Sequence, residues 1–380
     1  MKPRAAIICA SNPGNAGMYS VDLAAVDFMT RNSIDFDLFT SHAPSRRGRY
    51  RLLPLGIDIG HQPRETFGNL IFKRFSKMSQ LSRYSHVLYW GDFTPNPVYG
   101  QEDFHRVQRR YDVRSSGEQS LDRWARLFNF SGGKTVSKII AVGNNFQHDY
   151  SVDSDLYQKY LQNLGSNFDL IMPRDLFSVA NLKSVLTVPS DSKVRPGLDP
   201  AFLLRGASGD DDTRKEPIFC YRFARSKIPS SERFLSELEK ATGCRGVHLS
   251  QWDKFAPSGA DSLFSQYISD IRRSRFVVTD LYHLAINAMR LGVPVFGLGN
   301  PAESQRGSLG DFKKKILFKM LNLERFYIEV DPGGSQGVDG LIEHIGRELP
   351  LYEQNLPDIY SRKNRLVQAF EDDLLSALVH

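Results

Sequence analysis

Short apolar runs alternate with amphipathic stretches along the first half of the chain. The runs have the length of β-strands, and the stretches between them, such as residues 21–32, repeat apolar positions at helical spacing. This alternation is typical of βαβ units that build a parallel sheet covered by helices. The strands predicted in this half are residues 5–10, 34–40, 86–93, 138–144 and 168–175.

The same alternation restarts after Pro217. The intervening segment, residues 206–217, is polar and rich in Gly and Asp, which is typical of a linker between domains. Gly292 lies where a helix should end, as glycine commonly does. Beyond the linker we predict strands at 218–223, 245–250, 275–280 and 293–299, helices at 230–243, 262–274 and 284–292, and a long amphipathic helix at 358–379.

These patterns predict an α/β protein with two Rossmann-like domains that face each other across a cleft, which is a GT-B-like architecture. A chain of 380 residues is long enough to build two cores. Because ligands of open α/β sheets bind at the carboxyl ends of the strands, functional residues are expected there. The predicted parts are an N-terminal α/β domain (1–205), the linker (206–217), a C-terminal α/β domain (218–345) and a C-terminal helical segment (346–380).

Composition narrows the possible functions. The net charge of +6 favours anionic partners, but no dense Lys/Arg stripe or RNA-binding aromatic motif is present, so we expect acidic small substrates and no nucleic acid. Three cysteines match no zinc pattern, and we expect no metal. No apolar run reaches the roughly 18 residues of a membrane span. We therefore expect a cytoplasmic protein, with the inner membrane face as an alternative place of action.

The most informative segment is residues 274–299. A buried strand ends at Thr279 and Asp280, and a helix begins near His283. Backbone N–H groups at a helix start attract anions, and histidine exchanges protons near neutral pH. His283 is therefore the candidate catalytic residue, and its neighbour Tyr282 is a candidate for substrate binding. The alternative is that His283 only caps or packs.

Further candidates for substrate binding follow other predicted strands. Arg174 and Asp92 end strands of the first domain, and Arg222 and Arg225 follow the first strand of the second. Each would point toward the edge of the sheet where ligands bind. An alternative for Arg174 is that it pairs with Asp175 and braces the loop.

The loop after the first strand, residues 11–20, is rich in small residues. Backbone amides near Gly14 and Asn15 are candidates for holding a phosphate or a sugar. The loop lacks the complete glycine fingerprint of dinucleotide-binding proteins, and glycine-rich first loops are common in α/β proteins.

The ordered set of motifs resembles the polysaccharide pyruvyl transferase family over nearly the whole chain. The resemblance rests on seven segments in the family's order, and the sixth contains the His283 block. The segments are NPGNAGMYSVDLAAVDF, HVLYWGDF, IAVGNNF, PRDLFS, LDPAFLL, TDLYHLAINAMRLGVPVFGL and FKKKILFKMLNL.

The resemblance implies that the enolpyruvyl group of phosphoenolpyruvate is moved onto a saccharide or lipid-linked saccharide, forming a pyruvate ketal. Phosphoenolpyruvate would be the donor substrate, and no further cofactor is expected. The resemblance assigns acid/base catalysis to His283, and binding of phosphate or carboxylate to Arg174 and Lys313. Lys314 and Lys315 are alternatives to Lys313, because a long insertion precedes all three.

The chain departs from the family at Leu281. The family places Arg two residues before the histidine, and leucine cannot pair with an anion. We predict that Arg222 or Arg225 compensates by approaching His283 closely enough to share a bound anion.

Two other functions are compatible with the sequence. One is a glycosyltransferase of the same architecture that uses a nucleotide sugar, with Asp280 or Glu303 binding the nucleotide. The other is a non-catalytic family member within a polysaccharide assembly complex, which Leu281 suggests.

Overall fold

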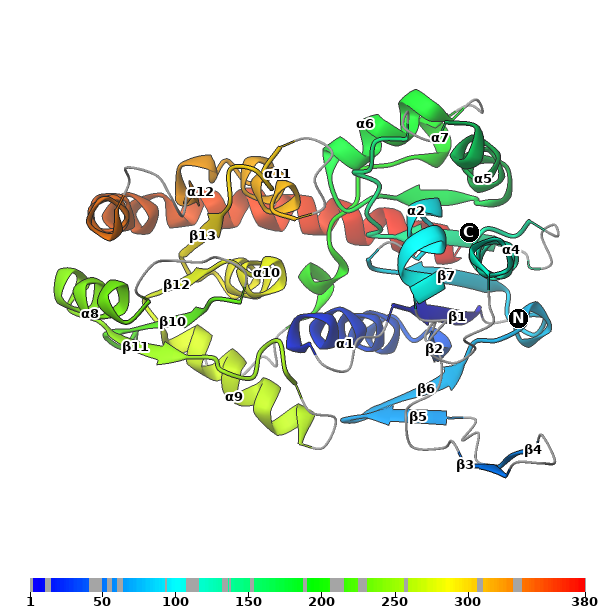
Figure 1. The fold of residues 1–380 in the computed structure, drawn as a ribbon, viewed down its shortest axis with the longest axis horizontal. Coiled ribbons are helices and arrows are strands. Elements are labelled where there is room, and N and C mark those ends of the chain that lie inside the picture. The colour runs from blue at the N-terminus through cyan, green and yellow to red at the C-terminus, as the bar shows by residue number, and fades with distance from the viewer. Residues whose placement is uncertain are drawn as a thin grey trace. The chain divides into compact units, whose positions relative to one another are not determined.

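The computed structural model describes most of the chain, and by their contacts the residues form two units (Figure 1). Unit 1 comprises Met1–Pro13, Val21–Pro200 and Asp373–His380, and unit 2 comprises Gly14–Ser20 and Ala201–Asp372. Each unit combines segments that are distant in the sequence, and the contiguous domain limits given above stay predictions. The described residues are 3–10, 15–40, 50–52, 57–59, 64–92, 94–106, 116–131, 136, 138–150, 154–186, 190–205, 215–224, 231–255, 259–305, 310–330 and 337–379.

Unit 1 contains a sheet of seven strands in the order β5-β6-β2-β1-β7-β8-β9. All neighbours pair in parallel except β5 and β6. Without β5, this is the 3-2-1-4-5-6 order of Rossmann-type sheets, whose ligand crevice lies where the order reverses, between β1 and β7. The strands are β1 (Arg4–Cys9), β2 (Asp35–Thr40), β5 (Arg64–Phe67), β6 (Leu70–Arg74), β7 (His86–Trp90), β8 (Lys138–Val142) and β9 (Leu170–Met172), with a separate antiparallel pair, β3 (Tyr50–Leu52) and β4 (Ile57–Ile59).

Helices pack against this sheet around a core rich in aromatic rings. Tyr89 of β7 lies at its centre, with Phe128 and Phe168 at ring-centroid distances of 5.8 Å and 5.5 Å. The helices in this part of the chain are α1 (Ala16–Arg31), α2 (Pro97–Tyr99), the π-helix η2 (Gly100–Phe104), α4 (Gly117–Phe128), α5 (Ser154–Asn167), α6 (Leu176–Val185) and α7 (Ser190–Lys193), with 3₁₀ turns η1 (Met78–Gln80) and η3 (Pro200–Leu203).

Unit 2 contains a parallel sheet of five strands in the order β11-β10-β12-β13-β14. This is the flavodoxin-like order 2-1-3-4-5, and its crevice lies between β10 and β12. The strands are β10 (Ile218–Arg222), β11 (Arg245–His248), β12 (Phe276–Thr279), β13 (Val295–Gly299) and β14 (Tyr327–Glu329). The helices are α8 (Ser231–Thr242), α9 (Ala260–Arg273), α10 (Tyr282–Arg290), α11 (Phe312–Met320), η4 (Glu324–Phe326) and α12 (Val338–Val379).

The nine strands predicted from the sequence are all present, and the α/β class with parallel sheets is confirmed. The predicted loop at 11–20 is wrong in its second half, because α1 already begins at Ala16. The Asn15 side chain explains this early start: its Oδ1 accepts hydrogen bonds from the backbone N–H of Gly17 (2.8 Å) and Met18 (3.3 Å). Asn15 is thus the N-cap of α1.

The C-terminal helix is longer than predicted. The apolar pattern predicts residues 358–379, but α12 begins at Val338 and passes through Pro350 and Pro357. Proline removes a helical hydrogen bond and usually ends or kinks a helix, so the sequence pattern pointed to a later start. Both prolines are exposed, and the carbonyl groups that they leave without a helical partner can accept water on that side.

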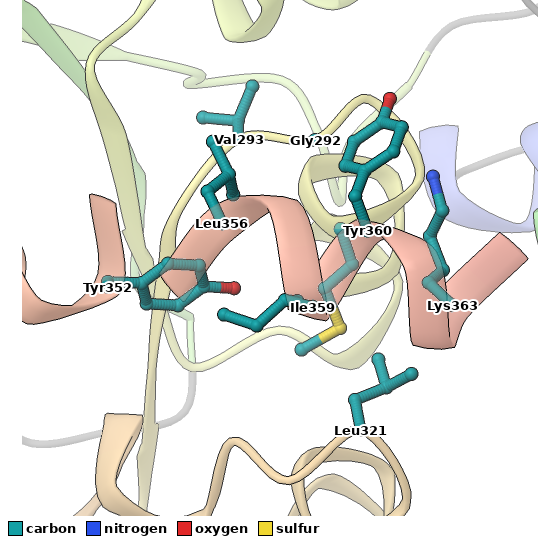
Figure 2. Close-up of a pocket in the computed structure, with 9 residues that line it drawn as sticks. Gly292, Val293, Leu321, Tyr352, Leu356, Ile359, Tyr360 and Lys363 are labelled. Carbon is teal, nitrogen blue, oxygen red and sulfur yellow. The ribbon is translucent and has the colours of Figure 1, made fainter. Parts of the chain in front are cut away.

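Helix α12 packs closely on the end of α10 (Figure 2). Gly292 ends α10 with a φ of 71°, and a Cβ placed there would lie 1.9 Å from Cε2 of Tyr360. Nearby, the Lys363 Nζ donates to the backbone oxygen of Arg290 at 3.0 Å. Glycine is therefore required at 292 both for the backbone conformation and for the approach of α12.

Candidate active site

In unit 1, the crevice position at the end of β7 is occupied by Gly91 and Asp92. Both have positive φ (70° and 49°), so the chain turns sharply there. The turn is held by hydrogen bonds from the Asn144 Nδ2 to the Gly91 oxygen (2.6 Å) and from the Asn145 N–H to the Asp92 oxygen (2.6 Å). Asp92 is half-buried at the predicted ligand edge of this sheet.

Arg174 follows β9 at the same edge of the sheet and is 4% exposed. Its Nε lies 3.9 Å from Oδ2 of Asp175, so the pair proposed as the structural alternative is present. The Asp175 carboxylate, however, makes shorter contacts with other residues. It accepts a hydrogen bond from the Ser178 N–H of α6 at 2.7 Å and another from the Gln147 Nε2 at 2.9 Å. Burial raises the pKa of Asp175, and the charge of Arg174 opposes that rise.

His148, which the sequence pattern does not single out, follows β8 at this side of the sheet. It is buried, and its Nδ1 lies 2.8 Å from the Nδ2 of Asn96. Burial lowers its pKa to about 4, and the positive charge of Arg174 adds to the effect. His148 is therefore neutral at physiological pH. The sequence signal was weak, because His148 lies six residues beyond the end of β8 at Val142.

A buried carboxyl group also lies in unit 1, on the second turn of α1. Asp22 is 2% exposed, and its Oδ1 has no hydrogen-bond partner among the described residues. Burial raises its pKa to about 8, although a hydrogen bond with Cys9 of β1 opposes the rise. The folded protein therefore keeps a proton at neutral pH that the unfolded chain releases.

Asp22→Asn is expected to stabilise the protein at alkaline pH. The folded-state pKa of Asp22 lies above the ordinary value of 3.8, so wild-type stability falls as pH rises from about 4 to 8, by up to about 1.4 kcal/mol per pH unit. Asparagine cannot ionise and removes this loss. Urea unfolding at pH 5, 6.5 and 8 would show the gap between variant and wild type widening with pH. Asp27→Asn, on the same helix, is the control, and pH profiles of equal slope for wild type and Asp22→Asn would contradict the assignment.

In unit 2, the ends of β10 and β12 are joined by side-chain hydrogen bonds. The Thr279 Oγ1 donates to the Arg222 backbone oxygen (2.8 Å) and accepts from the Leu281 N–H (3.0 Å). Asp280 is 1% exposed, and both carboxylate oxygens accept from the Ala224 N–H at 3.0 Å and 3.1 Å. Asp280 thus braces the loop after β10, and its binding of a nucleotide stays a prediction.

Helix α10 begins at Tyr282, two residues before the predicted segment 284–292, and places His283 in its first turn. Its N-cap is Leu281, which provides no side-chain hydrogen bond to that turn. The His283 ring is half-buried and meets the ring of Tyr282 edge to face at 5.2 Å. The Lys313 Nζ lies 5.5 Å from the centroid of Tyr282. The structure therefore brings His283, Tyr282 and Lys313 together.

The first turn of α1 lies against His283. A Cβ placed on Gly17 would be 2.2 Å from the Cβ of His283, so only glycine fits there. The Ser20 Oγ accepts from the Asn287 Nδ2 of α10 (3.0 Å), and the Ala16 N–H donates to the Trp252 oxygen (2.8 Å). Because the Gly17 N–H already donates to Asn15, these amides hold the turn in place beside His283.

The three consecutive lysines of α11 have different surroundings. Lys314 is 1% exposed, and its Nζ contacts the backbone oxygens of Asp280 and Leu298, both at 2.6 Å, and Oδ1 of Asp311 at 2.8 Å. Lys315 forms an ion pair with Glu329 at 2.7 Å. Lys314 therefore ties together the ends of β12 and β13, whereas Lys313 lies beside Tyr282.

Arg222 ends β10 and is held by two neighbours. Its Nε donates to Oδ1 of Asp253 at 2.6 Å, and its Nη1 lies 3.3 Å from Nε2 of His248. Two other candidates, Gly14 and Arg225, lie outside the described residues. The predicted approach of Arg222 or Arg225 to His283 stays a prediction.

Within the described ranges, no group of three or more His, Cys, Asp and Glu side chains is arranged to hold a metal ion. A search of the same residues for a helix of sufficient length and apolarity to cross a membrane also finds none.

The doubly wound strand order of both sheets defines an α/β protein of the doubly wound class, with polar side chains where each order reverses. The chain belongs to the polysaccharide pyruvyl transferase family: the model of that family matches residues 54–301, which is more than half of the chain. The matched range includes Arg174, Arg222 and His283, whereas Asn15 and Lys313 lie outside it. Sequence comparison with curated proteins finds no match.

Among solved structures, the chain is similar to the UDP-GlcNAc 2-epimerase of Neisseria meningitidis bound to UDP-GlcNAc, with 12% identity over 100% of both chains and a TM-score of 0.50. A functionally uncharacterised protein of Klebsiella pneumoniae has 16% identity over 86% of this chain and 93% of its own, with a TM-score of 0.46. For the UDP complex of MnaA from S. aureus, the identity is 12%, the coverage 98% and 97%, and the TM-score 0.42. At 12% identity, the likeness to the Neisseria meningitidis structure concerns the fold alone.

Proposed function

We propose that the protein transfers the enolpyruvyl group of phosphoenolpyruvate to a saccharide and forms a pyruvate ketal. The observation that supports this proposal most directly is His283 in the first turn of α10, at the crevice edge of the second sheet, in a chain of the pyruvyl transferase family. The first turn of α10 has no side-chain cap, and a helix start of this kind favours a bound anion.

The chemistry requires one proton donor and a site for a trianion. Protonation of the methylene carbon of phosphoenolpyruvate leaves a cation-like centre at C2, which one sugar hydroxyl attacks. Phosphate then departs, and a second hydroxyl attacks the same carbon to close the ketal. His283 is proposed to donate the first proton and to accept protons from the hydroxyls, as a general acid and base. Lys313, beside Tyr282, is proposed to bind the phosphate or carboxylate.

The direct test is transfer of carbon label from phosphoenolpyruvate into saccharide acceptors, including lipid-linked ones, with release of inorganic phosphate. We expect labelled, acid-labile product with at least one acceptor. Nucleotide sugars are the second set of donors, and transfer from one of them without any from phosphoenolpyruvate would favour the glycosyltransferase alternative. Inactivity with every donor would favour a non-catalytic member, to which Leu281 points.

Arg174→Ala is expected to weaken binding of phosphoenolpyruvate, since a charge-assisted hydrogen bond contributes about 1.5–3 kcal/mol. The measurement is a calorimetric titration of the donor. Arg174→Lys should recover part of the affinity, because lysine keeps the charge but loses the two-pronged geometry of the guanidinium. Arg195→Ala is the control, because Arg195 is a half-exposed arginine that pairs with Asp373. An unchanged donor affinity in Arg174→Ala would leave Arg174 with the bracing role alone.

A further inference from the structure

Aromatic rings are stacked at the carboxyl ends of β10 and β11. Tyr221 and His248 face each other across the two strands, with ring centroids 4.9 Å apart and planes inclined by 5°. Phe223 adds a further ring, 5.7 Å from Tyr221. β11 is the edge strand of the sheet, and His248 is exposed. Since Tyr221 covers one face of the imidazole, the outward side of the ring is presented to ligands.

The orientation of the His248 ring is fixed by Arg222. The Nη1 of Arg222 lies 3.3 Å from Nε2 of His248, and a guanidinium can only donate, so Nε2 is the accepting nitrogen and the proton resides on Nδ1. Partial burial and the charge of Arg222 lower the pKa of His248. His248 therefore offers a neutral ring and an Nδ1–H donor. Arg222 is in turn held by Asp253 at 2.6 Å.

Tyr221, Arg222 and His248 form a corner of the second sheet, and this corner lies at the same sheet edge as His283. Arg222 pairs in register with Thr279 of β12, and β11 follows on the other side of β10. Neighbouring strands lie about 4.8 Å apart, so His248 is about 10 Å across the edge from the end of β12, where α10 and His283 begin. A substrate that reacts at His283 and extends along this edge would reach His248.

We propose that His248, with the Arg222–Asp253 pair beside it, is a subsite for the acceptor saccharide, binding a sugar ring next to the one that reacts. This subsite rests on the proposed function. The apolar face of a sugar packs on an aromatic ring, while its hydroxyls bond to a donor such as Nδ1–H and to carboxylate oxygens.

The charges at the corner favour a sugar over a nucleotide. The positive charge of Arg222 is already balanced by Asp253, so the corner has little net attraction for a diphosphate, whereas neutral hydroxyls need only hydrogen-bonding groups. This assignment gives Arg222 a role in acceptor binding and leaves Arg225 as the arginine predicted to share the donor anion with His283.

The test compares His248→Ala and His248→Phe, with Arg245→Ala as the control at the exposed, opposite end of β11. The acceptors are the glycosides that the wild type turns over in a panel of methyl glycosides and disaccharides. We expect His248→Ala to raise the KM for a disaccharide about tenfold. His248→Phe should restore part of that loss, since it keeps the stacking surface. The KM for phosphoenolpyruvate, and kcat, should stay unchanged in all three variants.

An unchanged acceptor KM in His248→Ala, or an increased KM for phosphoenolpyruvate, would overturn the subsite. UDP is added as a competitor: competitive inhibition against the acceptor that disappears in His248→Ala would identify a nucleotide site instead. If the wild type transfers no label at all, the proposed function fails separately. The subsite is then tested by an NMR titration of histidine-labelled protein with disaccharides. A shift of the His248 resonance would support the subsite, and an unshifted resonance would overturn it.

Discussion

Replacing His283 with alanine is expected to lower the rate of pyruvyl transfer about 10²–10⁴-fold, the usual cost of removing a general acid/base. The fold should survive the change. The His283 ring is half-buried, and alanine keeps the Cβ against which Gly17 packs. The measurement is the single-turnover rate with saturating phosphoenolpyruvate, together with the unfolding midpoint to show that stability is retained.

The control is His344→Ala. His344 lies on α12, and its ring contacts the backbone oxygen of Arg325 at 2.9 Å, away from the first turn of α10. We expect transfer at the wild-type rate in this variant. A His283→Ala protein that also transfers pyruvate at near the wild-type rate would remove His283 from the chemistry and leave it a packing residue of α10.

The second large effect is expected for Lys314→Met, and it is an effect on stability. Methionine fits the space of the aliphatic stem but leaves the buried carboxylate of Asp311, which is 4% exposed, without its cation. Breaking a buried ion pair from one side typically costs about 3–5 kcal/mol. The loss also frees the ends of β12 and β13, which Lys314 holds through the oxygens of Asp280 and Leu298. Denaturant unfolding should show a clearly lower midpoint.

Lys315→Met is the matched control, one residue further along the same helix. Lys315 is about half exposed and pairs with Glu329 at the surface, and pairs of this kind contribute roughly 0–1 kcal/mol. If both methionine variants unfold at the same midpoint, the contacts of Lys314 do not stabilise the sheet edge as the structure implies.

The nine predicted strands could be found because each is a short apolar run bounded by polar residues, and this signal is local. β3 to β6 and β14 were not predicted. The limits of the helices needed information that the pattern lacks. Asn15 begins α1 by a hydrogen bond to its own helix, and the runs around Pro350 and Pro357 stay helical within α12. Asparagine is a favoured N-cap, which the apolar pattern does not record. At the two prolines, the exposed side of α12 outweighs their tendency to end a helix.

The candidate site was predicted in part. Residues at strand ends, such as Arg222 and His283, could be found because the topology of a parallel sheet gathers them at one edge. The lysines of α11 could not be told apart, since successive residues of a helix point about 100° apart and only tertiary contacts show which one is buried. His248 was missed because its partners, Tyr221 and Arg222, come from a different strand.

The membership of residues 14–20 in unit 2 has a consequence for how this protein can be dissected and recombined. A fragment that begins at Ala201 lacks Gly17 and Ser20, and so exposes the surface of α10 around His283 and Asn287. Chimeras that exchange the second unit between relatives must therefore carry these seven residues with it. Such chimeras must also keep glycine at position 17, since a Cβ there would lie 2.2 Å from the Cβ of His283.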